Sequence, residues 1–315
     1  MLDTLTPLTE HTAAAAVPTI AKILVVVDPT ATVHPCIEKA VRIATRLGSA
    51  LELYICDADE HSENREHRRQ QFAEMLVELA APLRARGLIV TTVCEAHAPL
   101  PRGIGEHVVR SKPDLVIKDT HGHQLSIRRP LALTDWTLIS QLPVPLMLVR
   151  ATAWPAQPRI AIATDPCHPA DRPESLDERM IATGCLLANA TGGSAEALHV
   201  LQPPLHLPGE PVPAIERARV HGAARDSVEQ VVARASNLAA PMPVQFVEGN
   251  VAAGIVAYAT AHRPDLLVLG AAARGRWSGS SAGGTAARIL EELTCDALII
   301  KPRGFVSPLL VSDEA

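Results

Sequence analysis

Aromatic residues are scarce in this chain of 315 residues: they make up 3% of it, although apolar residues make up 47%. A core with so few rings must be packed mainly by Ala, Val, Leu and Ile. Such aliphatic cores are typical of parallel sheets, whose strands are buried on both faces by helices. The composition therefore favours an α/β protein. The length favours about two domains, because single cores of ~100–200 residues are the norm.

Clusters of basic residues and long apolar runs are also missing. The formal net charge is −5, and a protein without a basic patch has no electrostatic footprint for nucleic acid. No stretch approaches the ~18 uncharged apolar residues that a membrane span needs. Residues 1–19 contain neither Lys nor Arg, unlike the start of a secretory signal, and we expect a flexible tail there. The six cysteines form no C-x-x-C pair, which is typical of reduced thiols in a cytoplasmic protein.

The sequence repeats itself. A strand pattern that ends at Asp28-Pro recurs at Asp165-Pro, 137 positions later. A Pro-Asp-Leu phrase around Asp114 recurs around Asp265, 151 positions later, and a closing strand follows both at the same spacing. Three landmarks in matched order indicate a duplicated unit. The difference between the two offsets predicts an insertion of 14 residues in the second copy, within its Pro- and His-rich loops.

Each copy alternates strands with helical stretches. This alternation predicts right-handed crossovers and a parallel sheet with helices on both faces. We therefore expect two doubly wound, five-stranded α/β domains in tandem. The expected division is an N-terminal tail 1–19, domain 20–150, proline-containing linker 151–158, domain 159–303 and C-terminal tail 304–315.

Glycines follow the fourth predicted strand of the second copy. That strand runs into Gly270, and the next helix is preceded by Gly283, Gly284 and Thr285. Glycine allows backbone amides to approach an anion without obstruction by a Cβ. The start of the helix adds free N–H groups and a partial positive charge, and Thr285 is a candidate cap. The segment therefore predicts a phosphate site.

This segment resembles the ATP-binding motif of the universal stress protein family, G-x-x-G-x9-G-[S/T]. Gly270 matches the first glycine and Gly283 the last, while Ala273 stands in place of the second. Arg274 matches the arginine that is usual in the family. If position 273 requires a positive φ, its alanine costs roughly 1 kcal/mol. The whole layout, including Trp154-Pro155 in the linker, most resembles the tandem E-type members.

The resemblance implies a fold, a ligand and a role. The fold is of adenine-nucleotide alpha-hydrolase-like type, and the two halves form a pseudo-dimer through strands 146–149 and 298–300. The second domain is expected to bind ATP, with Mg²⁺, or a related small ligand, and the protein to act as a stress-response regulator. Asp165 matches a position beside adenine and ribose, and Val200 another on the adenine side. A further homodimer of the tandem chain is also expected.

The first copy departs further from the motif. The positions matching the glycine segment hold Asp119, Gly122, Ala132, Leu133 and Thr134. A carboxylate in place of the first glycine repels phosphate by ~1 kcal/mol at 4 Å even in water. We therefore expect no nucleotide site in the first domain.

Several alternatives stand beside this interpretation. Asp28 and Asp165 each precede proline, and such pairs often only turn the chain. Histidines and cysteines follow several strands, as in Cys167-His168, but no zinc-ligand spacing is present, so no metal site is expected. Segment 270–285 contains no Asp, Glu or His, which disfavours a slow ATPase and leaves no catalytic residue. A non-nucleotide binding or scaffold protein with two degenerate sites is the other alternative.

Overall fold

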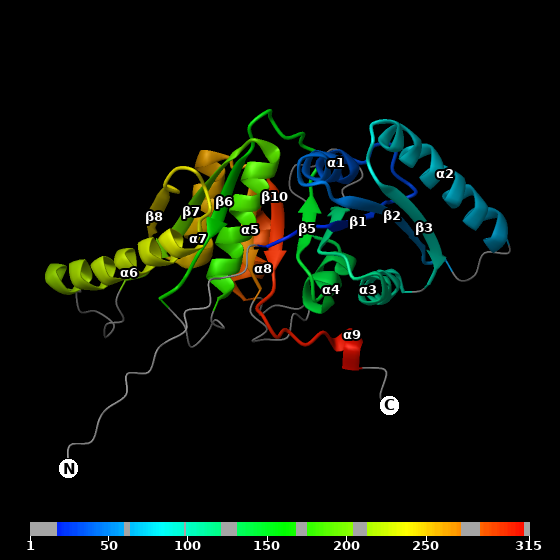
Figure 1. The fold of residues 1–315 in the computed structure, drawn as a ribbon. Coiled ribbons are helices and arrows are strands. Elements are labelled where there is room, and N and C mark those ends of the chain that lie inside the picture. The colour runs from blue at the N-terminus through cyan, green and yellow to red at the C-terminus, as the bar shows by residue number, and fades with distance from the viewer. Residues whose placement is uncertain are drawn as a thin grey trace, which may run out of the picture.

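The structure, a computed structural model, describes residues 18–59, 64–97, 99–120, 131–167, 175–203, 213–271 and 284–311. Strands and helices alternate along the described parts of both halves (Figure 1). The first half comprises β1 (Lys22–Val26), α1 (Pro35–Leu47), β2 (Ala50–Asp57), α2 (Arg65–Ala85), β3 (Val90–Ala96), α3 (Leu100–Ser111), β4 (Leu115–Asp119), α4 (Leu133–Gln141) and β5 (Leu146–Val149). The second half comprises β6 (Arg159–Ala163), α5 (Leu176–Thr191), β7 (Ser194–Leu201), α6 (Ala214–Ala235), β8 (Val244–Glu248), α7 (Val251–His262), β9 (Leu266–Gly270), α8 (Thr285–Glu292), β10 (Asp296–Ile300) and α9 (Pro308–Val311).

In the described parts of the chain, ten strands form one sheet. Their order is β3-β2-β1-β4-β5-β10-β9-β6-β7-β8, so each half has the doubly wound order that was predicted. The two halves join where β5 and β10 pair antiparallel, with Met147 beside Leu298. The pairing of the last strands is therefore confirmed, and it fuses the two expected sheets into a single one. Among the described residues, no helix has the length and apolar character needed to cross a bilayer.

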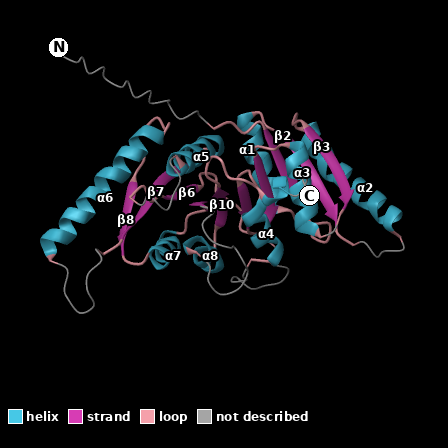
Figure 2. Ribbon diagram, turned by 90° about the horizontal axis from the view of Figure 1, so that it is seen from below, coloured by secondary structure: helices cyan, strands magenta, loops and turns pink. Residues whose placement is uncertain are grey.

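Helices cover both faces of the sheet (Figure 2). In the second half, α5 and α6 lie on one face, and α7 and α8 lie on the other. Two hydrophobic clusters fill the corresponding layers, and alternate residues of one strand belong to different clusters. Val268 faces the α5 layer, for example, while Leu267 and Leu269 face the α7 layer. This sheet buried on both faces accounts for the aliphatic strands seen in the sequence.

The duplication extends to the register of the strands. Lys22 pairs with Ala50 in the first half, and Arg159 pairs with Ser194 in the second. The offset between matching strands is 137 at β1 and β6, and 151 at β4 and β9. It has already grown to 144 where β2 matches β7. The insertion is therefore divided, with the first seven residues falling between β6 and β7.

The repeated Pro-Asp-Leu phrase has a structural role. Asp114 accepts hydrogen bonds from the backbone N–H groups of Ala21 and Lys22, at 2.8 and 2.9 Å. Asp265 accepts one from the N–H of Arg159 at 2.8 Å. Each carboxylate thus satisfies the first amides of the central strand of its own half, which would otherwise lack a partner in the sheet.

A buried ion pair links the two halves. Lys39 of α1 lies 2.7 Å from Asp296 at the start of β10, and the side chains are 4% and 2% exposed. Asp296 also accepts hydrogen bonds from the N–H of Arg150 at 2.8 Å and from the indole of Trp154 at 2.7 Å. The linker tryptophan is therefore part of the junction between the halves.

The chain returns to the first half after β10. Ser307 is fully buried and donates a hydrogen bond to the carbonyl of Gln141, which ends α4. Leu309 of α9 packs against α3, so closely that a Cβ added to Gly105 would lie 2.4 Å from Leu309 Cδ1. The first part of the C-terminal tail therefore fastens the second half to the first.

Candidate functional site

Five of the eight predicted site residues lie in described parts of the second domain. They follow or end strands β6, β7 and β9, which are neighbours in the sheet, or begin α8. Because the carboxyl ends of parallel strands share one edge, the topology gathers these elements where doubly wound sheets bind ligands. The five are Asp165, Val200, Gly270, Gly284 and Thr285. The other three, Ala273, Arg274 and Gly283, lie outside the described residues.

Gly270 ends β9 against helix α5. A Cβ added to it would lie 2.9 Å from both Leu176 Cδ2 and Met180 Sδ. Real Cβ atoms do not approach other atoms so closely, and both of these side chains are buried. The absence of a side chain at Gly270 therefore allows α5 to pack closely against the end of β9.

Helix α8 begins without a side-chain cap. Gly284 is its N-cap residue, and Thr285 is the first helical residue. The prediction that Thr285 caps the helix is therefore wrong, because its hydroxyl lies one position too late to reach back to the N–H groups of the first turn. The first turn also lacks an acidic residue. No side chain of the helix itself thus competes with an anion for this end.

The first domain places its own carboxylates at the matching positions. Asp119, in place of Gly270, accepts a hydrogen bond from the backbone N–H of Cys36 at the start of α1, at 2.8 Å. Burial raises the pKa of Asp119, and the hydrogen bonds from Cys36 oppose that rise. Asp135, in place of Ala286, accepts a hydrogen bond from the N–H of Ala132 at 3.2 Å. Backbone N–H groups at the starts of α1 and α4 thus already have carboxylate partners.

A buried ion pair holds Asp135 in that place. Its Oδ1 lies 2.9 Å from Lys118 Nζ, and the two side chains are 0% and 2% exposed. Lys118 also donates to the carbonyl of Asp119 at 2.8 Å. The matching positions in the second domain are Leu269 and Ala286, which carry no charge. At these matched positions the first domain therefore has charged side chains, whereas the second has uncharged ones. Gly122, the one motif glycine of the first copy, lies outside the described residues.

The predicted adenine-side residues differ in their surroundings. The side chain of Val200 is 4% exposed and packs in the layer under α7, where a Cβ added to Gly254 would lie 3.2 Å from its methyl groups. Asp165 lies just beyond β6, and its backbone N–H donates to Asp177 Oδ1 at 2.8 Å. Its match Asp28 turns the chain instead, since Asp28 Oδ1 accepts from both the N–H and the hydroxyl of Thr30.

Asp165 also belongs to a cluster that sequence reasoning missed. One side-chain donor atom from each of Asp165, Cys167 and His199 lies within 4.8 Å of the others. Burial raises the pKa of the Cys167 thiol, and the charge of Asp165 raises it further. His199 lies in the next strand, 34 positions after Asp165, so no known ligand spacing indicated that the two residues meet. The only sequence signal was a histidine inside an apolar strand.

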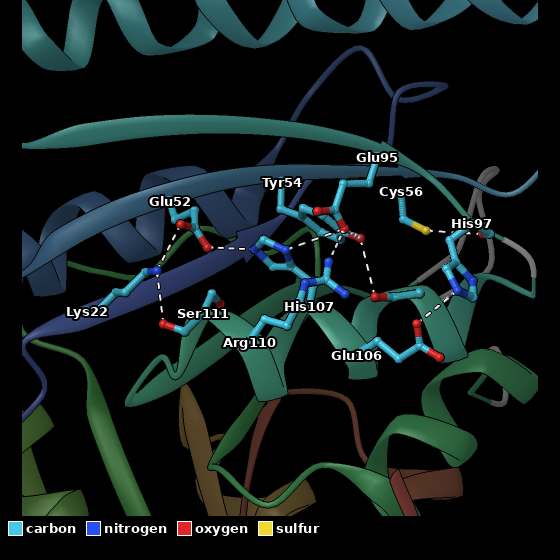
Figure 3. Close-up of polar contacts among 11 residues, drawn as sticks. Lys22, Glu52, Tyr54, Cys56, Glu95, His97, Glu106, His107, Arg110 and Ser111 are labelled. Carbon is cyan, nitrogen blue, oxygen red and sulfur yellow. Dashed lines mark hydrogen bonds and ion pairs between the residues drawn. The ribbon is translucent and has the colours of Figure 1, made fainter. Parts of the chain in front are cut away.

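A second missed cluster fastens α3 to the sheet of the first domain (Figure 3). His107 Nε2 lies 2.7 Å from Glu52 Oε1, and Lys22 Nζ lies 2.8 Å from Glu52 Oε2. The His107 ring stacks on Tyr54 at 4.2 Å between centroids. Burial tends to raise the pKa of Glu52, but the hydrogen bonds and charges of Lys22 and His107 bring it below its ordinary value. The cluster is a buried ion network, which we interpret as structural.

A cavity of about 660 Å³ lies between the two halves. Residues of α5, the start of β4 and β5, and the segment after β10 line it, among them Arg179, Arg303 and Phe305. Burial lowers the pKa of Arg179, and the charge of Arg303 lowers it further. None of the five described residues of the predicted nucleotide site lines this cavity.

The sequence model of the universal stress protein family matches residues 19–150 and again residues 159–301. The chain belongs to the universal stress protein family. It contains two such domains in tandem, as the repeat predicted. Universal stress protein E of Escherichia coli K12 is 23% identical over 315 residues, covering 92% of this chain and 97% of that protein. The protein of the same name from Salmonella typhi is 23% identical over 307 residues, covering 92% of this chain and 97% of that protein.

Solved structures share the fold. A functionally unknown protein from Pseudomonas aeruginosa PAO1 superposes with a TM-score of 0.71 at 22% identity, covering 91% of this chain and 94% of that one. A universal stress protein from Archaeoglobus fulgidus superposes with a TM-score of 0.65 at 13% identity, covering 89% and 98%. The universal stress protein fold is therefore common to both halves of the present chain.

Proposed function

We propose that this tandem universal stress protein is a cytoplasmic stress-response regulator whose second domain binds ATP, with Mg²⁺, or a related phosphate-containing ligand. One observation carries the proposal. Two carboxylates occupy the phosphate edge of the first domain, Asp119 and Asp135, and both are replaced by uncharged residues in the second. An anion is repelled by these carboxylates in the first domain and attracted by the start of α8 in the second, which has no side-chain cap.

The test is equilibrium binding of labelled ATP to the full chain and to two variants at Gly284. A Cβ added there meets nothing within 4 Å, and its φ is −56°, so side chains fit without strain. Asp and Asn are both favourable N-cap residues and differ here in charge alone. The carboxylate of Gly284→Asp should repel the phosphates by more than ~1 kcal/mol and weaken ATP binding at least about tenfold. Gly284→Asn can cap the same N–H groups without a charge, so it should bind ATP more tightly than Gly284→Asp does.

A matched control lies in the first domain. Leu133 is the counterpart of Gly284 and is 75% exposed, so Leu133→Asp is tolerated structurally. It should leave ATP affinity unchanged, since the proposal places no nucleotide in that domain. Failure of the wild type to bind ATP, or equal affinity of Gly284→Asp and Gly284→Asn, contradicts the nucleotide part of the proposal.

We propose binding rather than hydrolysis. A slow ATPase needs a carboxylate to hold the metal and a base beside the phosphates, and segment 270–285 contains no Asp, Glu or His. Incubation of the chain with ATP and Mg²⁺ should therefore release no phosphate above the spontaneous rate. Pairing of two tandem chains into a homodimer stays a prediction, which sedimentation equilibrium tests directly.

The cavity between the halves favours a second candidate, binding of a small non-nucleotide anion. Arg179 and Arg303 both line it, and two guanidinium groups beside one cavity attract a carboxylate or sulfonate. Mass spectrometry of the chain purified under native conditions identifies such a compound directly. Its loss in Arg303→Ala, with ATP binding retained, would assign it to the cavity rather than to the start of α8.

A further inference from the structure

Three side chains with different donor atoms converge near the carboxyl ends of β6 and β7. They are the carboxylate of Asp165, the thiol of Cys167 and the imidazole of His199, and their donor atoms lie within 4.8 Å of one another. An ion placed centrally among three such atoms lies within about 2.8 Å of each, whereas zinc bonds are ~2.0–2.3 Å long. Shifts of well under an ångström would therefore complete the coordination.

The imidazole of His199 is already oriented as a metal ligand. The residue is 4% exposed, and its Nδ1 lies 2.9 Å from the carbonyl oxygen of Thr164. A carbonyl only accepts hydrogen bonds, so Nδ1 is the donor in this contact and Nε2 is the nitrogen available to a metal. Metal-binding histidines typically have their second nitrogen fixed in this way. The edge of the ring also meets Phe246 at 6.2 Å between centroids, which restrains its rotation.

The thiol completes a set of donors that selects the metal. Cys167 is partly exposed, and its Sγ lies 3.9 Å from the carbonyl of Ala224 in α6. A thiolate is a poor ligand for Mg²⁺ and Ca²⁺, which prefer oxygen, whereas sulfur, nitrogen and carboxylate ligands together suit Zn²⁺. Three protein ligands leave the fourth tetrahedral position to water or to a bound molecule.

The first domain provides an internal comparison. The positions that match Asp165, Cys167 and His199 in strand register hold Asp28, Thr30 and Ile55. Ile55 is a fully buried core residue, and Asp28 binds Thr30. The second domain therefore has a histidine where the shared fold accepts an aliphatic side chain, together with a thiol on the facing loop. Burial of a polar ring is costly unless its nitrogens have partners, and coordination of a metal ion is one such partner.

We propose that the second domain binds one Zn²⁺ ion through Asp165, Cys167 and His199. The ion would lie on the α5 and α6 side of the sheet, next to the edge where the nucleotide is expected. Zinc binding does not depend on the proposed nucleotide function, because the three ligands form a site on their own. It also departs from the sequence-based expectation, which included no metal.

Cobalt is the most informative probe. The full chain, freed of metal with a chelator and kept reduced, is titrated with Co²⁺ in the absence of nucleotide. The wild type should develop a thiolate-to-cobalt charge-transfer band and the intense visible absorption of tetrahedral Co²⁺, and one equivalent of Zn²⁺ should bleach both. Competition against a chromophoric chelator then gives the zinc affinity.

Two conservative variants test the assignment. Cys167→Ser should abolish the charge-transfer band, and Asp165→Asn should lower zinc affinity at least about tenfold. Both positions are partly exposed, so the folded state is expected to persist, and far-UV circular dichroism checks it. Cys94→Ser, a partly exposed thiol of the first domain, is the matched control and should bind like the wild type. The proposal is overturned if the wild type binds no zinc, or if Cys167→Ser and Asp165→Asn each bind zinc as tightly as the wild type does.

Discussion

Gly193 joins α5 to β7 at a place where the linker between the domains passes very close. Gly192 before it has a φ of 67° and ends the helix in the left-handed conformation that glycine tolerates. A Cβ added to Gly193 would lie 2.1 Å from the backbone oxygen of Pro158. The two glycines therefore have different reasons to be there: a backbone conformation at one and a lack of space at the other.

Gly193→Ala should lower the free energy of unfolding by about 2 kcal/mol or more, because a backbone oxygen must move to admit the methyl group. Gly222→Ala is the matched control. Gly222 lies inside α6 with nothing within 4 Å of an added Cβ, so alanine should raise the free energy of unfolding by ~0.5–1 kcal/mol. Urea denaturation measures both, and a tolerated Gly193→Ala would contradict the close approach.

Lys301 predicts a pH dependence at the residue scale. It is 3% exposed, and burial lowers its pKa to about 8 from 10.5. The Phe305 ring lies 4.4 Å from its Nζ, yet burial prevails. Between these pH values the unfolded chain holds the Lys301 proton and the folded chain releases it. Stability contributed by this group therefore rises as pH increases from about 8 to 10.5.

Lys301→Met should remove that rise, which is worth up to about 3 kcal/mol for a shift of this size. Other buried groups titrate in the same range, notably thiols such as Cys295, whose pKa burial raises to about 12. The informative quantity is thus the difference between variant and wild type, measured by denaturation at pH 7 and pH 10. A difference that stays constant across this range would mean that Lys301 keeps its ordinary pKa.

Single residues also mark the limit of the sequence-based site prediction. Asp28 and Asp165 look alike in sequence, since both follow a buried strand and precede proline. Their partners differ: Asp28 accepts a hydrogen bond from Thr30 within a turn, whereas Asp165 lies beside the side chains of Cys167 and His199. Convergence across two strands depends on register, which a single sequence does not reveal. The roles of Ala273, Arg274 and Gly283 in binding a ligand stay predictions.

At the scale of elements, most of the fold could be predicted from the internal repeat. The strand landmarks place β4 and β9 at the predicted offset, and the Asp-Leu phrase marks a position with a definite structural role. The ends of elements were less predictable. Gly87 is a sequence signal for the end of the helix before β3, and α2 ends two residues ahead of it, at Ala85, with Arg86 as its C-cap. Gly87 follows in the left-handed conformation, with φ of 84°.

The network around His107 shows why contacts between elements escaped prediction. Its members come from β1, β2, β3 and α3, and nothing in their spacing relates them. His107 lies in the middle of α3, yet its ring is buried against Tyr54 of β2 and pairs with Glu52. Such contacts follow from the packing of the helix on the strands, which only the assembled fold defines.

His107→Leu should lower the free energy of unfolding by about 2–3 kcal/mol, because buried Glu52 loses one of its two partners and the leucine cannot replace the hydrogen bond. His97→Leu is the control. His97 also pairs with a glutamate, Glu106, but the two side chains are 33% and 31% exposed, and pairs accessible to solvent contribute ~1 kcal/mol or less. Equal losses of unfolding free energy in the two variants would argue against the structural role that we assign to the buried network.

At the scale of the whole molecule, duplication produced a pseudo-dimer whose halves have diverged in charge. The halves share one sheet, and their junction is not symmetric. The counterpart of Lys39 in α5 is Thr183, and the counterpart of Asp296 is Pro145. The ion pair between Lys39 and Asp296 therefore occurs once, on the side of the junction where α1 meets the start of β10. A symmetric homodimer of identical subunits would have this ion pair twice or not at all.

Lys39→Met tests how strongly this single pair joins the halves. Removal of Lys39 leaves the buried carboxylate of Asp296 with the N–H of Arg150 and the indole of Trp154, but without its ion-pair partner. Breaking a buried pair in this way typically costs ~3–5 kcal/mol, and we expect a loss of that size in urea denaturation. Arg102→Met, which breaks the exposed pair of Arg102 with Glu106, should cost no more than ~0.5 kcal/mol.

Because the pair of Lys39 with Asp296 lies at the junction of the halves, the Lys39→Met variant should also unfold less cooperatively. In a background that carries Trp136→Phe and Trp277→Phe, fluorescence of Trp154 should then change at lower urea than the far-UV circular dichroism. Coincident transitions at wild-type stability would show instead that the pairing of β5 with β10 and the packing of α1 on α5 suffice to join the halves.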